Sequence, residues 1–221
     1  MAMLKTAQSR PDLLLLLSLV LIILIYPVLD HGDVRRAVLG ILMFLPIILA
    51  ILRLSAIKRW VWPAVVLMSI TVVTSVAANV YPHPYLIGAK WALLAAFFGL
   101  TVFGLFPYIR NARSVTDSHL YTAISIYLLL GMQWFAVYAA IDRFFPGSIL
   151  LAQAAGTDQS SELLYFSLVT ISTIGYGDIV PLSGEVRMLA ALEGVTGVLY
   201  VAITVALLVS SYKQQDADGP H

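Results

Sequence analysis

The stretch STIGYGD, residues 172–178, combines residue types that suit the binding of a cation by backbone oxygens. Glycine adopts left-handed dihedral angles at little steric cost, so Gly175 and Gly177 allow successive carbonyl groups to face a common axis. Ile174 and Tyr176 would then direct their bulk away from that axis and brace the backbone. Carbonyl oxygens arranged in this way could replace the water shell of a dehydrated cation.

The composition of the 221-residue chain requires a lipid bilayer around this stretch. Hydrophobic residues make up 60% of the chain and charged residues only 11%, whereas soluble domains carry about 25% charged residues. The apolar bulk also argues against a nucleic-acid partner, and the lack of cysteine excludes thiolate chemistry. A bilayer core needs about 20 mostly apolar residues per helix. Six runs meet this requirement: Leu13–Leu29, Ala37–Ile57, Val61–Val80, Tyr85–Pro107, Leu120–Ile141 and Val186–Ser210.

The direction of these helices follows from the basic residues in the short loops. Lys and Arg gather on the cytoplasmic side when the N-terminus is placed inside. The first run has no small-residue cleavage site after it, so it is interpreted as a membrane helix and not as a signal peptide. We therefore expect a multi-pass protein of the plasma membrane, of the bacterial inner-membrane type, with both termini in the cytoplasm.

The apolar run Leu163–Ile171 is too short to cross a bilayer and is expected to be re-entrant. Residues 158–162 are rich in helix-capping and acidic side chains, which favours a helix that begins there and ends near Ser172. The C-terminal end of such a helix carries a partial negative charge that attracts cations. Extended backbone at membrane depth is tolerated only where it is buried in protein or lines a water-filled path.

The segment TIGYGD, from Thr173 to Asp178, resembles the TVGYGD selectivity filter of tetrameric potassium channels, with Ile174 in place of valine. The resemblance extends over residues 120–211. It implies an all-α membrane protein with six transmembrane helices, one re-entrant pore helix and a filter loop. It also implies a homotetramer in membrane lipid that conducts K⁺ passively, without enzymatic activity or a cofactor. The filter residues so implied are Thr173, Ile174, Gly175, Tyr176 and Gly177, with K⁺ held from Thr173 to Tyr176.

Further roles are implied for the helices around the filter. Gly197 stands where these channels commonly carry a hinge glycine. Val201, Val205 and Val209 follow at four-residue spacing and would form an apolar wall of the pore. Ordinary helix packing is the alternative reading of both features. Tyr165 stands where many relatives carry a tryptophan that hydrogen-bonds the filter aspartate.

The filter is expected to be supported by Asp178, Tyr165 and Glu193. We expect the Tyr165 hydroxyl to reach Asp178. Glu193 is the one acidic residue well inside a predicted spanning helix, and such groups usually mark function. It should lie behind the filter, near the hydroxyls of Thr170 or Ser172, as a support and a candidate proton-sensitive gate. The alternative is a place near the outer interface, satisfied by water or by Arg187.

The chain is predicted to divide at a short polar linker. Residues 1–109 form a four-helix membrane domain, residues 110–118 a cytoplasmic linker, residues 119–211 the pore domain and residues 212–221 a short cytoplasmic tail. A voltage sensor needs several arginines on its fourth helix. The fourth run holds only Lys90, so voltage gating is not expected. A peripheral scaffold is the preferred role of the first domain.

Three other functions fit part of the pattern. A non-selective cation channel of the same superfamily would share the architecture. The string Gly175 to Asp178 also fits the GxGD pattern of intramembrane aspartyl proteases. Such a protease needs a second aspartate at membrane depth, and the candidates Asp30 and Asp142 lie at the ends of apolar runs. A potassium transporter subunit would need four pore loops, and this chain has one.

Overall fold

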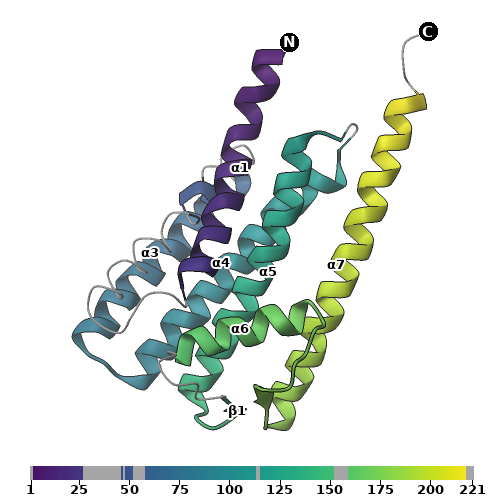
Figure 1. Ribbon diagram of the computed structural model, residues 1–221. Coiled ribbons are helices and arrows are strands. Elements are labelled where there is room, and N and C mark those ends of the chain that lie inside the picture. Colours follow the sequence, from purple (N-terminus) through teal and green to yellow (C-terminus); the bar gives the residue numbers. More distant parts are fainter. Residues whose placement is uncertain are drawn as a thin grey trace.

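A computed structural model describes residues 2–26, 46, 48–51, 58–112, 115–151 and 159–217 (Figure 1). Most of these residues are helical. The elements in chain order are α1 (Ala2–Ile25), α3 (Lys58–Val80), α4 (Pro84–Arg110), α5 (Asp117–Phe144), β1 (Ile149–Leu150), α6 (Gln159–Ile171), β2 (Val180–Pro181) and α7 (Gly184–Ala217).

Four helices in the described part are long and apolar enough to cross a bilayer. They comprise Trp60–Val80, Pro84–Arg110, Asp117–Phe144 and Gly184–Tyr212. The apolar part of α1, Pro11–Ile25, is shorter. Most of the predicted second run, Ala37–Ile57, lies outside the described residues. The sequence therefore has the long apolar helices that were expected, and the count of six spans stays a prediction.

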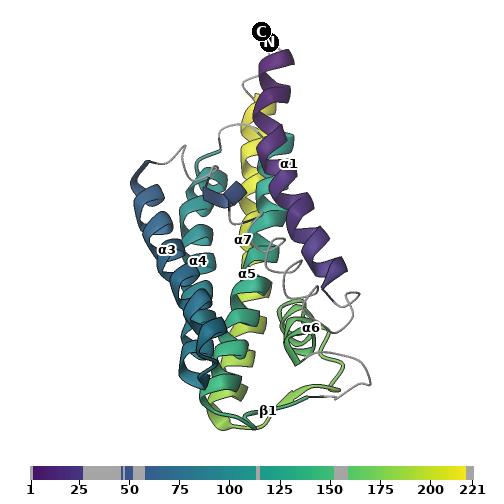
Figure 2. The same cartoon turned by 90° about the vertical axis from the view of Figure 1, so that its left-hand side faces the viewer.

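Helix α5 is the centre of the fold, because α1, α4, α6 and α7 all contact it (Figures 1 and 2). Aromatic side chains fill the space around it, as the apolar faces of the helices predict. Phe135 and Tyr138 of α5 are fully buried, and the ring of Phe135 lies edge-on to that of Trp91 from α4 at 5.1 Å. Helix α3 lies on α4 at the periphery.

Helix α6 is short and lies across the bundle between α5 and α7, near the end that carries β1 (Figure 1). The N-terminal end of α1 and the C-terminal end of α7 both lie at the opposite end of the bundle (Figures 1 and 2). The strands β1 and β2 pair antiparallel, with Ile149 opposite Pro181. This pairing ties the loop after α5 to the segment that follows residues 172–178.

Hydrogen bonds at the other end of the bundle join the first helices to α5 and α7. Ser118, in the first turn of α5, donates to the carboxylate of Asp12 from α1, and the hydroxyl of Tyr108 from α4 donates to Ser118 at 3.0 Å. The Ser211 hydroxyl of α7 donates to the carbonyl of Ala112 at 2.8 Å. The predicted linker is thus bonded both to the first helices and to α7, whereas the predicted N-terminal and pore domains meet directly where α4 packs on α5.

Candidate functional site

The backbone of residues 173–177 alternates in the sign of φ. The angle is +59° at Thr173, +55° at Gly175 and +81° at Gly177, whereas Ile174 and Tyr176 do not have positive φ. Carbonyl groups alternate in direction along an ordinary extended strand. Reversing the sign of φ at every second residue turns the peptide planes over, so that successive carbonyls come to one side. Such a row of oxygens is the arrangement that can coordinate a dehydrated cation.

Thr173 is strained, because a β-branched residue at positive φ is a genuine outlier. Strain of this kind persists where the surrounding structure enforces it and is concentrated at functional sites. The enforcing contacts come from the end of α6. The amide of Thr173 donates to Thr170 O at 3.0 Å, and the amides of Ile174 and Gly175 both donate to Val169 O, at 3.0 and 3.4 Å.

The side chains of Ile174 and Tyr176 are left uncovered by their own chain. They are 56% and 70% exposed, although both are large and apolar or aromatic. The ring of Tyr176 is parallel to that of Tyr165 from α6, with centroids 6.4 Å apart. The Tyr165 hydroxyl lies close enough to the carboxylate of Asp178 to interact with it. That this contact supports the filter stays a prediction.

Helix α6 has 13 residues, which corresponds to a length of roughly 20 Å at 1.5 Å per residue. Its C-terminal end leads directly into residues 172–178, so the partial negative charge of that end lies beside the row of carbonyls. Its other end is fixed by Gln159, which donates to Asp142 of α5 at 2.7 Å and accepts from Arg143 at 3.2 Å. The helix is therefore held at both ends.

Glu193 lies in the interior between three helices. Its side chain has no exposed surface. The hydroxyl of Tyr138 from α5 donates to Oε2 at 2.6 Å, and the hydroxyl of Ser167 from α6 lies 2.6 Å from Oε1. The partners of Glu193 are thus Tyr138 and Ser167 and not the expected Thr170 or Ser172, and its role as a support behind the filter stays a prediction.

The partners differ for a physical reason. Ser172 directs its hydroxyl back to the carbonyl of Leu168 in its own helix, at 2.6 Å, so it is already satisfied. Ser167 lies one turn earlier, on the face of α6 that meets α5 and α7. The alternative in which water or Arg187 satisfies Glu193 was also wrong, because the side chain is fully buried and its partners are the two hydroxyls.

Gly197 marks the closest approach of α7 to α6. A Cβ atom at this position would lie 2.1 Å from the carbonyl oxygen of Ile171. At Gly194, one turn earlier, the nearest atom to an added Cβ would be Thr170 O at 3.7 Å, which is an ordinary contact. The last carbonyls of α6 are thus covered by the two glycines, and Tyr127 donates to Ile171 O at 3.3 Å.

The three valines of the predicted pore wall lie on a face of α7 that the chain itself does not cover. Val201, Val205 and Val209 are all exposed, and each belongs to the same helical stripe. The opposite face is buried: Tyr200 donates from there to the carbonyl of Ala123 at 2.6 Å. The orientation leaves the valine face free to line a pore or to meet another copy.

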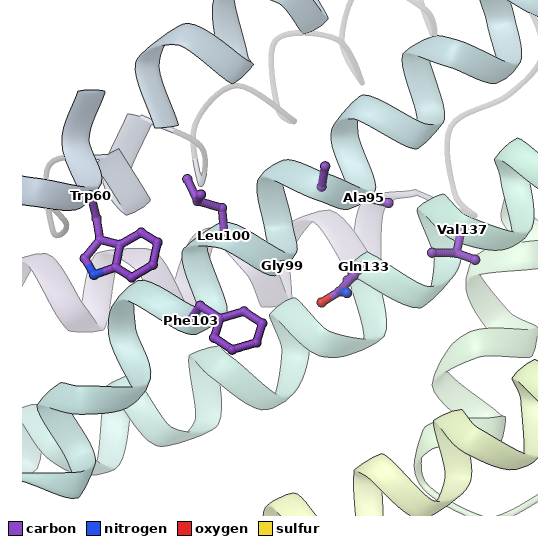
Figure 3. A pocket seen from close by; sticks show the side chains of 8 residues that line it. Trp60, Ala95, Gly99, Leu100, Phe103, Gln133 and Val137 are labelled. Carbon is purple, nitrogen blue, oxygen red and sulfur yellow. The ribbon is translucent and has the colours of Figure 1, made fainter. Parts of the chain in front are cut away.

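No group of three or more metal-binding side chains occurs among the described residues. Asp30 lies outside them, and Asp142 is bonded to Gln159. A hollow of about 470 Å³ opens between α3, α4 and α5 (Figure 3), and none of residues 172–178 lines it. Its lining is apolar apart from the amide of Gln133 and the indole of Trp60.

Comparisons with known proteins agree with this geometry. Residues 127–214 match the family model described as "Ion channel". The potassium voltage-gated channel protein shk-1 of Caenorhabditis elegans is 41% identical over 49 residues, which are 22% of this chain and 9% of that protein. Two pore potassium channels b and a of Oryza sativa subsp. japonica are 37% and 35% identical over 75 and 81 residues.

The matched segments are short parts both of this chain and of the relatives. They cover 34% and 37% of this chain and 19% and 20% of the two rice proteins. The chain thus spans about a fifth or less of the length of the relatives reported above. No solved structure gave a significant match.

Proposed function

We propose that this chain is a member of the potassium channel superfamily, as the match of residues 127–214 and the similar potassium channels support, and that it is the subunit of a K⁺-selective channel. It is a channel protein and not an enzyme, and its apolar helices are those of a multi-pass membrane protein. The observation that carries the proposal is the alternation of φ from Thr173 to Gly177. The backbone oxygens from Thr173 to Tyr176 hold K⁺ and let it pass down its electrochemical gradient.

The pore is formed by four copies of the chain. One chain supplies a single row of carbonyls, and a cation needs oxygens on all sides. Ile174 and Tyr176 are exposed and are therefore available to contact neighbouring copies in this assembly. Neighbouring copies would cover them. The valine face of α7 then looks toward the axis below the filter, and Gly197 sets how closely α7 approaches α6.

The first helices serve as a scaffold in the membrane and not as a voltage sensor. Lys90 is the one basic residue within the predicted fourth run, and its ammonium lies over the ring of Trp91 at 4.9 Å. The N-terminal end of α1 and the C-terminal end of α7 lie at the same end of the bundle (Figures 1 and 2), which supports a topology with both termini in the cytoplasm of a bacterial cell.

The function is tested by flux through the purified protein in liposomes. Vesicles loaded with K⁺ or Na⁺ are diluted into ion-free buffer, and the collapse of the gradient is followed. We expect K⁺ to leave much faster than Na⁺, and block of the K⁺ flux by Ba²⁺, a divalent ion close in size to K⁺. Equal rates for the two ions would favour the non-selective channel. Absence of any flux, together with proteolysis that Asp178→Ala abolishes, would favour the protease.

Tyr165→Phe is expected to shorten the time for which the filter conducts. The change removes the hydroxyl that bonds Asp178 and leaves the ring that lies parallel to Tyr176. A hydrogen bond to a charged group that is partly exposed is worth about 1 kcal/mol, which corresponds to roughly a fivefold effect. Single-channel recording in planar bilayers at low K⁺ measures this as shorter bursts of opening.

Tyr85→Phe is the matched control for this variant. Tyr85 is exposed, stacks on His83, and lies in the first turn of α4. Its hydroxyl has no hydrogen-bond partner among the described residues. Bursts of unchanged length in Tyr165→Phe, or equal shortening in Tyr85→Phe, would remove Tyr165 from the support of the filter.

A further inference from the structure

Three polar side chains from three different helices meet at one point inside the pore domain. Glu193 of α7 is fully buried, and so are Tyr138 of α5 and Ser167 of α6. The carboxyl group lies 2.6 Å from each hydroxyl, with one oxygen facing Tyr138 and the other facing Ser167. Distances this short are typical of strong O–H···O bonds. Each oxygen of the carboxyl group therefore has a hydrogen-bond partner within the protein.

The number of hydrogens at this point constrains the protonation of Glu193. The Ser167 oxygen lies 2.6 Å from Glu193 Oε1 and 2.8 Å from the carbonyl oxygen of Gly131. A hydroxyl has one hydrogen and can donate to only one of these acceptors at a time. Two close contacts between oxygens need two hydrogens, so the second must come from the carboxyl group. A neutral carboxylic acid supplies it.

The surroundings offer no charge that would stabilise a carboxylate. In the part of the chain that the structure describes, Glu193 forms no ion pair with Lys, Arg or His, and its partners are the two hydroxyls. The titratable groups that face it are both phenols of α5, Tyr138 and Tyr127. A buried charge without a counter-ion is costly, and at membrane depth it is costlier still. The lack of a counter-ion and the number of hydrogens thus both indicate a neutral carboxylic acid at Glu193.

We propose that Glu193 is a neutral carboxylic acid that positions the pore helix, donating its hydrogen to Ser167 and accepting one from Tyr138. Ser167 in turn donates a hydrogen bond to the carbonyl oxygen of Gly131. Three consecutive hydrogen bonds therefore join α5, α6 and α7. The inference rests on the proposed function only in naming α6 as the helix that carries the filter. Tyr138 and Ser167 are further positioning residues that could not be identified from the sequence.

These three hydrogen bonds fix α6 close to its C-terminal end, from which the filter begins. Ser167 lies one turn before the last carbonyls of α6, and these carbonyls lie against Gly194 and Gly197 of the same inner helix. Helix α7 therefore holds α6 at two successive levels, first by hydrogen bonds and then by close packing. A displacement of α7 would be transmitted to the start of residues 172–178 through both contacts.

Substitutions at Glu193 separate a neutral acid from an ion. Glu193→Gln retains one acceptor for Tyr138 and one donor for Ser167, so we expect K⁺ flux and thermal stability close to those of the unaltered protein. Glu193→Ala leaves the Tyr138 hydroxyl without an acceptor and leaves Ser167 with only its bond to Gly131, and we expect roughly a tenfold loss of flux. Tyr138→Phe and Ser167→Ala should each give a smaller loss. Tyr200→Phe is the control, because it removes an equally short buried bond between α7 and α5 without touching α6.

Infrared difference spectroscopy on the purified full chain near neutral pH reads the protonation state directly. We expect the C=O stretching band of a protonated carboxylic acid, lost in Glu193→Gln and shifted in Tyr138→Phe. Absence of that band, or Glu193→Gln as impaired as Glu193→Ala, would overturn the proposal. The infrared and stability measurements do not depend on conduction. If the unaltered protein failed to conduct K⁺, the proposed function would fail and these two measurements would still decide the state of Glu193.

Discussion

Gly175→Ala is expected to abolish K⁺-selective flux. Gly175 has φ of +55°, and a side chain in the left-handed region costs about 1–2 kcal/mol per residue. In the proposed tetramer the cost arises four times, so the filter conformation would lose about 4–8 kcal/mol. A backbone that relaxes to negative φ would turn its carbonyl away from the axis. Gly177→Ala, at φ of +81°, should have the same effect.

The cause of this loss can be isolated with a third glycine. Gly147 also has a positive φ, of +85°, and open space around its Cβ position, as have Gly175 and Gly177. It lies in the turn before β1, outside the filter. Gly147→Ala should therefore reduce stability by a similar amount per chain and leave K⁺ selectivity unchanged. Liposome flux of K⁺ against Na⁺ compares the three variants. Selective flux from both Gly175→Ala and Gly177→Ala would exclude residues 173–177 as the ion-binding site.

The sequence predicts these elements well where local chemistry decides. Glycine at alternate positions allows positive φ at little steric cost, and the backbone has it at Gly175 and Gly177. The short apolar run before the filter was expected to be a helix ending near Ser172, and α6 ends at Ile171. The length of an apolar run, the capping of a helix and the conformational freedom of glycine depend on residues that are neighbours in the sequence. They can therefore be predicted without a structure.

Contacts between helices could not be predicted in the same way. The rotation of α6 about its axis decides whether Ser167 or Thr170 faces Glu193, and packing against α5 sets that rotation. Tyr138 gave no signal, because one tyrosine in an apolar run looks like any other. Asp12 was also missed as a partner of Ser118. An acidic residue beside an apolar run could have drawn attention to that contact.

Gly197→Ala is expected to destabilise the protein and to reduce K⁺ flux. The added Cβ would lie 2.1 Å from Ile171 O and 2.9 Å from Ile171 Cγ1, so α7 must move away from the end of α6. Overpacking of this kind costs about 1–3 kcal/mol. The displacement would also shift the residues from which the filter begins. Thermal unfolding of the detergent-purified protein and liposome flux measure the two effects.

Gly194→Ala should raise the stability of the protein, which is the opposite of the effect expected for Gly197→Ala. Its Cβ would have only an ordinary contact at 3.7 Å, and alanine is favoured over glycine inside a helix by about 0.8–1.0 kcal/mol. The pair thus distinguishes two roles for Gly197. If Gly197 serves only as a flexible hinge, alanine there should stiffen α7 and raise stability, as at Gly194. If Gly197 is needed for close approach to Ile171, stability must fall at residue 197 and not at residue 194. Equal stabilisation at both positions would contradict the contact that the structure shows.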